Sequence, residues 1–247
     1  MKKSLLILAI VSVAGMLASC NGNGKTAANE NEEVPTDVVV EEPTTGSLAG
    51  HDWVDLGLPS GTKWATCNVG ASKPEEYGDY FAWGETTMKE ECSWINYSFR
   101  ESGDAYGNVK FNKYKSDGRN GVVDSLDVLE TADDAAAANW GNDWRMPTKQ
   151  EMKELDDSCK ATWTTKNGVQ GCLITGPNGN SIFLPAAGYR NITNMEYLGT
   201  LCGYWSSSDD THYSYAAWSL ICNMSSCYID REQYRYYGLS IRPVCAN

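Results

Sequence analysis

Apolar and polar residues form short alternating runs from residue 51 to the end of the chain. Glycine, asparagine, serine and aspartate interrupt these runs roughly every eight to twelve residues, a spacing typical of short strands joined by turns and long loops. Strands are expected in four segments: KWATCNVG, GDYFAWGE, GVQGCLITGPNGNSIFLPAAGYR and residues 215–245. In the third segment, GPNGNS separates the apolar runs CLI and IFLP and predicts a hairpin turn.

A helical pattern occupies residues 131–141, TADDAAAANWG. Thr131 or Asp133 can cap its first turn, because each offers a side-chain oxygen to the free backbone N–H groups there. Four alanines follow, and Gly141 stands where a helix is expected to end. The segment predicts a short helix.

A second helical pattern occupies residues 146–159, MPTKQEMKELDDSC. Thr148 and Glu151 have the spacing of a capping box, and one apolar face is formed by Met152, Leu155 and Cys159. Both helices are expected to pack on strands. All nine Trp and fourteen Tyr lie after residue 50, so residues 51–247 are predicted to form a single α+β domain with a mostly antiparallel sheet.

Residues 1–19 have the pattern of a bacterial lipoprotein signal peptide, with Lys2 and Lys3 before an apolar run and Cys20 directly after the small residues. The apolar run is too short for a stable membrane span. We expect cleavage before Cys20, lipidation of that cysteine and a place in the outer membrane facing the cell surface, with a periplasmic orientation as the alternative. A plain secretory signal with an incidental cysteine is the other interpretation.

Residues 20–50 are rich in acids and contain no aromatic residue. Such a segment buries too little apolar surface to offset chain entropy, so it is predicted to be a disordered tether. The whole chain has a formal net charge of −12. Acidic proteins without a basic cluster are poor partners for nucleic acids and anionic membrane surfaces, so the lipid anchor is the membrane contact we expect.

The sequence contains few residues suited to catalysis. It has no Gly-x-Ser-x-Gly, no His-Glu-x-x-His, no glycine-rich phosphate loop and no EF-hand spacing, and its histidines are His51 and His212. Eight cysteines follow Cys20, and Cys222 and Cys227 are the nearest pair. Disulfides or buried free thiols are favoured over a zinc site, which usually has closer pairs. No enzyme activity, metal or other cofactor is predicted.

Paired aspartates occur at three places. The pairs at residues 133–134 and 156–157 fit a helix start and a solvated helix face. Asp209 and Asp210 follow the letters YWSSS in an expected loop and are candidates to contact Ca²⁺ or a sugar hydroxyl.

Half of the fourteen tyrosines lie between residues 204 and 237, among polar and charged residues. Tyrosine gives a large contact area at low entropic cost, and Ser, Asp and Arg add directional hydrogen bonds, as in antibody paratopes. In the expected strand YAAWSLIC, Ala216, Trp218, Leu220 and Cys222 would face the core, which leaves the opposite face for ligand. The predicted ligand-binding residues are Asp209, Asp210, His212, Tyr213, Tyr215, Tyr228, Asp230, Arg231, Gln233, Tyr234, Tyr236 and Tyr237.

Five motifs in order resemble one known family: WVDLGLPSGTKWATCNVGA with EEYGDYFAWGE, NWGNDWRMPTKQEMKEL, NGNSIFLPAAGYR, GYWSSS and GLSIRPV. They are similar to the family named for the major paralogous domain of Fibrobacter succinogenes, found in lipoproteins of Bacteroidetes. The resemblance implies a C-type-lectin-like fold, shared with formylglycine-generating enzymes and with the variable proteins of diversity-generating retroelements. Arg145 and Arg242, each next to a proline in these motifs, are expected to be scaffold residues.

Three classes of function are compatible with these residues and with the resemblance. The first is binding of an unknown glycan or protein through the C-terminal strands and loops, whose residues resemble positions that retroelements diversify. The second is a structural or adhesive role in a surface assembly. The third is formylglycine-type oxidation, which the resemblance would place at two thiols that bind copper, with Cys222 and Cys227 as the matching pair. Binding is the function that we expect.

Overall fold

The β-strands of the computed structural model form five small sheets, all within one compact unit, Glu42–Asn247. The model describes residues 44–104, 109–115 and 122–246, and within this range it describes the side chains of all residues except 229–232. The predicted signal peptide, Cys20 and most of the predicted tether therefore lie outside the described residues. Among the residues described, no helix combines the length and the apolar character needed to cross a bilayer.

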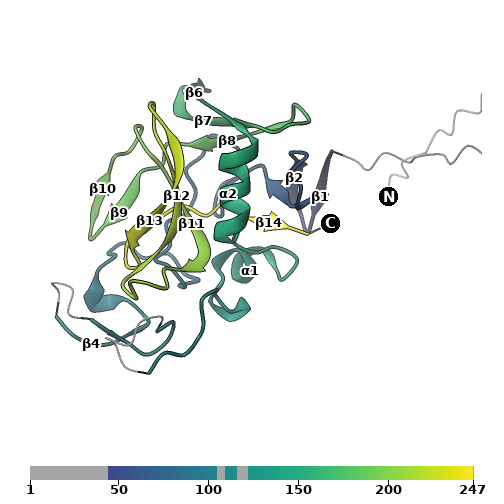
Figure 1. Cartoon of the computed structure of the whole chain (residues 1–247). Coiled ribbons are helices and arrows are strands. Elements are labelled where there is room, and N and C mark those ends of the chain that lie inside the picture. The colour runs from purple at the N-terminus through teal and green to yellow at the C-terminus, as the bar shows by residue number, and fades with distance from the viewer. Residues whose placement is uncertain (1–43, 105–108, 116–121, 247) are drawn as a thin grey trace, which may run out of the picture. The chain divides into compact units, whose positions relative to one another are not determined.

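One four-stranded sheet joins the beginning and the end of the compact unit (Figure 1). Its strand order is β1-β2-β3-β14, and its strands are β1 (Thr45–Leu48), β2 (His51–Asp55), β3 (Lys63–Ala65) and β14 (Val244–Cys245). All neighbours in it are antiparallel. Because β1 lies before residue 51, the prediction of a disordered tether up to residue 50 was wrong at its C-terminal end.

Two three-stranded antiparallel sheets enclose a large part of the core. The first contains β6 (Lys160–Lys166), β7 (Val169–Thr175) and β8 (Ser181–Pro185), and the second contains β11 (Cys202–Asp209), β12 (Ala216–Cys222) and β13 (Cys227–Tyr234). The predicted hairpin between CLI and IFLP is confirmed, since β7 and β8 pair across the turn that holds Gly179 at φ +86°. Both sheets contribute buried residues to one apolar cluster.

Two helices are confirmed at the predicted places. α1 (Ala135–Trp140) follows a 3-10 turn (Thr131–Asp133), but Asp134 caps it instead of Thr131 or Asp133, because its carboxylate accepts from the backbone N–H groups of Ala136 and Ala137. α2 (Lys149–Ser158) begins with the predicted capping box of Thr148 and Glu151. Figure 1 shows α2 alongside the β11–β13 sheet, which it contacts through all three strands.

The remaining elements are short. They are a 3-10 turn (Trp94–Asn96), β4 (Arg100–Ser102) paired with β5 (Lys110–Phe111), and β9 (Tyr189–Asn191) paired with β10 (Asn194–Glu196). The predicted strand GDYFAWGE is reduced to a single bridge between Phe81 and Leu239. Two residues away on either side, the N–H of Asp79 donates to Val69 and that of Trp83 to Arg235, so no continuous ladder forms. The result is a mostly antiparallel α+β fold, as the pattern of residues predicted.

The expected open face of β12 is absent. Ala217, Ser219 and Ile221 are buried, and Trp218, assigned to the core, is the half-buried residue of the strand. The pairing of β12 shifts register between Ala217 and Ser219, so a strict alternation of faces fails there. The Nζ atom of Lys149 lies 3.1 Å from the centre of a Trp218 ring and partly covers it.

Candidate functional site

Seven tyrosine rings contact one another in an unbroken series, which we call the tyrosine row. Successive ring centroids are 4.7 to 5.8 Å apart, and the members in order of contact are Tyr213, Tyr215, Tyr234, Tyr236, Tyr237, Tyr189 and Tyr197. Tyr197 is 59% exposed and Tyr234 is 42% exposed, while the other five are half-buried. The row is therefore a packed aromatic surface that solvent can reach.

Arg235 explains why Tyr234 and Tyr236 point outward together. Its side chain is fully buried, with the guanidinium 4.7 Å from the centre of the Trp83 ring and bonded to Asp209 and to the carbonyl of Tyr114. Tyr234 is the last residue of β13, and residues 234–237 form a turn in which the Tyr237 N–H donates to the Tyr234 carbonyl at 2.8 Å. The side chain of Arg235 enters the core within this turn, and the rings of Tyr234 and Tyr236 stack outside it, with centroids 5.7 Å apart.

Two backbone contacts bring the remaining members of the row into place. Arg235 N–H donates to the carbonyl of Tyr215 at 3.0 Å, which sets Tyr215 beside Tyr234. Gly238 and Arg190 exchange both of their backbone hydrogen bonds, which sets Tyr189 beside Tyr237. Tyr189 and Tyr197 could not be predicted as members of the row, because only the folded chain brings β9 next to residue 238.

The phenol groups in the middle of the row stay neutral over a wide pH range. Burial raises the pKa of Tyr189 to about 12 and also raises the pKa values of Tyr236 and Tyr237. Each hydroxyl therefore keeps its proton at physiological pH and can both donate and accept a hydrogen bond. The row combines apolar ring surface with such hydroxyls, which is a composition suited to binding.

The structure moves two predicted ligand-binding residues into the interior. Asp209 is 2% exposed and pairs with Arg235, and Asp210 is 1% exposed and accepts from the backbone N–H of His212 at 2.9 Å. Neither carboxylate can meet a ligand at the surface, so both are corrected to scaffold residues. The side chain of His212 is 83% exposed, and its Nδ1 lies 3.5 Å from Asp210.

The other predicted residues divide between the row and its surroundings. Tyr213, Tyr215, Tyr234, Tyr236 and Tyr237 belong to the row. Tyr228 is 42% exposed, and no ring contact joins it to another aromatic residue of the described chain. Gln233 is half-buried opposite Ala217. The side chains of Asp230 and Arg231 lie outside the described part of the chain.

The two arginines expected to be scaffold residues differ in burial. Arg242 is 1% exposed and donates to Asn68 and to the carbonyls of Ala65 and Phe183. Arg145 is more exposed and donates from both ends of its guanidinium to Glu151. Arg242 therefore joins segments that are distant in sequence, whereas the side chain of Arg145 joins its own loop to the start of α2, six residues further on.

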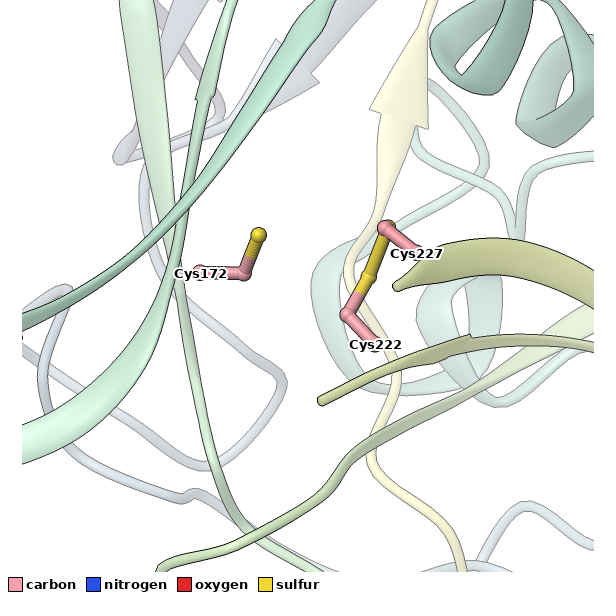
Figure 2. A group of neighbouring side chains, drawn as sticks. All are labelled: Cys172, Cys222 and Cys227. Atoms are coloured by element: carbon pink, nitrogen blue, oxygen red, sulfur yellow. A yellow bond between two sulfur atoms is a disulfide. The ribbon is translucent and has the colours of Figure 1, made fainter. Parts of the chain in front are cut away.

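Cys222 and Cys227 form a disulfide at the end of the β12–β13 hairpin. The Sγ atoms of these two residues and of Cys172 all lie within 4.8 Å of one another, and Figure 2 shows the Cys172 side chain directed from β7 toward the disulfide. Burial raises the pKa of Cys172 to about 11. The sequence predicted either disulfides or buried free thiols, and both occur. Cys222 and Cys227 form a disulfide, and Cys172 and Cys202 are buried free thiols.

Comparisons of the chain with protein-family models, with curated proteins and with solved structures found no match. The tyrosine row and the sequence motifs are therefore the features that point to a function.

Proposed function

We propose that this chain is a cell-envelope lipoprotein whose folded domain, C-type-lectin-like in its motifs, binds a glycan or protein ligand without catalysing a reaction. The observation that carries the proposal is the tyrosine row, seven rings in continuous contact on the surface. The lipoprotein signal at residues 1–19 and Cys20 supports its place in the envelope.

The packing of the row favours binding for an energetic reason. A tyrosine that already contacts its neighbours has lost much of its side-chain freedom, so a ligand that orders it further pays little entropy. Buried Arg235 and its ion pair with Asp209 fix the backbone beneath Tyr234 and Tyr236. The surface is therefore preorganised before the ligand arrives.

The experiment compares two sets of variants of the mature, lipid-free chain on a glycan array. Replacement of both Tyr234 and Tyr236 by alanine removes two adjacent rings from the middle of the row, and we expect it to lower binding at least tenfold, because two aromatic contacts are lost. Tyr228→Ala is the matched control: it lies in the same strand with the same 42% exposure as Tyr234, outside the row. We expect its binding to match the unmodified chain.

Loss of binding in the control but not in the double variant would move the site to the β12–β13 hairpin. If no glycan binds, the same variants are tested for co-purification with envelope proteins. Co-purification that depends on Tyr234 and Tyr236 would identify a protein ligand and support the assembly role. Co-purification that survives their removal would reject the tyrosine row as the contact surface.

A further inference from the structure

Four cysteines from four different strands meet where the two three-stranded sheets face each other. Cys172 lies in β7, Cys202 in β11, Cys222 at the end of β12 and Cys227 at the start of β13. Cys172, Cys202 and Cys222 are at most 2% exposed, and Cys227 is half-buried. These residues are separated by up to 55 positions in the sequence, so the fold alone brings them together.

The sulfur atoms of three of these residues are already close. The Sγ atoms of Cys172, Cys222 and Cys227 lie within 4.8 Å of one another. In a tetrahedral zinc thiolate site each Zn–S bond is about 2.3 Å, which puts neighbouring sulfurs about 3.8 Å apart. Opening the disulfide lets the sulfurs of Cys222 and Cys227 move apart to that spacing. Cys172, which Figure 2 shows directed toward them, completes a three-sulfur set.

Cys202 lies beside this set, although its sulfur is not within 4.8 Å of all three others. It is directly opposite Cys222 in the β11–β12 pair, so both side chains lie on the same face of that sheet. Its thiol donates to the carbonyl of Leu184 at 3.2 Å, and Leu184 is the residue of β8 directly opposite Cys172. The Cys202 thiol therefore spans the same gap between the sheets as the other three.

We propose that the reduced chain binds one soft divalent cation of the zinc class through Cys172, Cys222 and Cys227, with Cys202 as the fourth ligand. A dithiol reductant opens the Cys222–Cys227 bond by thiol–disulfide exchange: it gives two electrons and its two thiol protons, becomes a disulfide itself, and leaves Cys222 and Cys227 as thiols. The cation then displaces protons from the thiols that bind it. Thiolate sulfur favours such cations over Mg²⁺ and Ca²⁺, which prefer oxygen ligands. The site is independent of the proposed ligand-binding function.

The half-buried position of Cys227 gives the cation a route to the site, since the other three sulfurs are covered. Among the described residues, the group containing Cys172, Cys222 and Cys227 is the one place where three or more cysteine, histidine or acidic side chains come close enough to share an ion. Metal binding elsewhere in that part of the chain would therefore need a larger rearrangement.

The test is a titration of the full mature chain with Cd²⁺, monitored by the ultraviolet charge-transfer band of cadmium thiolates, and with Zn²⁺, monitored by native mass spectrometry. After reduction by a phosphine in oxygen-free buffer, we expect one equivalent of either cation per chain. The oxidised chain should bind neither. Cys172→Ser should lower the affinity of the reduced chain by roughly tenfold or more, because one sulfur ligand is lost.

Cys67→Ser is the matched control, because Cys67 is a half-buried free thiol outside the cluster, and it should bind as the unmodified chain does. A circular dichroism spectrum and a urea midpoint that match those of the unmodified chain show that Cys172→Ser is folded; if it is misfolded, Cys202→Ser replaces it. A reduced chain that binds neither cation would overturn the proposal. Equal affinity of the serine variant and the unmodified chain would do the same.

Discussion

The buried ion pair of Asp209 and Arg235 connects the core to the tyrosine row. Both side chains are fully buried, and Arg235 also donates to the carbonyls of Ala216 and Tyr114. A charge in the interior is tolerated when it is paired and its hydrogen bonds are satisfied. One residue pair therefore fixes the direction of Tyr234 and Tyr236, on either side of Arg235.

Asp209→Asn should strongly destabilise the fold, because it removes one charge of the pair and leaves that of Arg235 buried. We expect a loss of about 3–5 kcal/mol in the free energy of unfolding, measured by urea denaturation. Asp157→Asn is the control: its ion pair with Lys153 lies in solvent, and surface pairs contribute little. Equal losses of unfolding free energy in the two variants would contradict this prediction. They would show that Arg235 is compensated by other groups once the charge of Asp209 is removed.

Single residues also show the limits of prediction from sequence. Asp209 and Asp210 follow a serine run that suggests an exposed loop, yet β11 continues to Asp209 and both carboxylates are buried. The signal that could have corrected this is Arg235, an arginine between two tyrosines. Its buried partner, Asp209, however, lies 26 residues away in the sequence. No local sequence pattern predicts a pair over that separation.

At the scale of elements, α2 was predicted well because its signals are local. The capping box needs only Thr148 and Glu151, three positions apart, and the buried face needs only Met152 and Leu155. β12 was predicted poorly because its bulge depends on β11 and β13, where pairing shifts register on both sides. Local capping can be identified in a sequence, whereas a register shift depends on the partner strands.

Glu151 also makes the start of α2 sensitive to acid. Burial disfavours its charge, but hydrogen bonds from Arg145 and from the Thr148 backbone outweigh burial and lower its pKa to about 2. The folded chain thus holds this proton less tightly than the unfolded chain, whose glutamate has its ordinary pKa near 4.5. The stabilisation is complete above about pH 4.5 and is lost as the pH falls toward 2.

Glu151→Gln should cost about 2–3 kcal/mol of unfolding free energy at neutral pH and flatten the pH dependence between 4.5 and 2. Glutamine can still close the capping box, so the change reports the charge and its pair with Arg145. Urea denaturation at a series of pH values measures both effects. Glu154→Gln is the control, because Glu154 lies in the same helix and its carboxylate accepts an exposed hydrogen bond from Ser60. If the unfolding free energy of Glu151→Gln depends on pH as steeply as that of the unmodified chain, Glu151 is not the cause of the acid sensitivity.

At the scale of the whole molecule, the sheet β1-β2-β3-β14 joins residues that are about two hundred positions apart. The sequence predicted strands across residues 215–245, which include the GLSIRPV motif, but only the last residue of that motif, Val244, lies in β14. It could not predict which strand β14 would pair with. A separate long-range contact, the bridge between Arg190 and Gly238, brings β9 next to the C-terminal segment and so completes the tyrosine row.

Deletion of residues 244–247 tests whether this closure holds the domain together. Val244 and Cys245 are at most 1% exposed, they pair with Trp64 and Lys63 of β3, and Val244 exchanges two backbone hydrogen bonds with Arg145. Burying one such side chain contributes about 1.5–3 kcal/mol, and the whole fold of a typical domain is stable by about 5–15 kcal/mol. We therefore expect the truncated chain to unfold at much lower urea concentration or to remain unfolded, as followed by circular dichroism and limited proteolysis. Deletion of residue 247 alone leaves β14 intact and should keep the original midpoint. If both truncated chains share that midpoint, β14 is dispensable and the domain is held by the contacts of the other sheets.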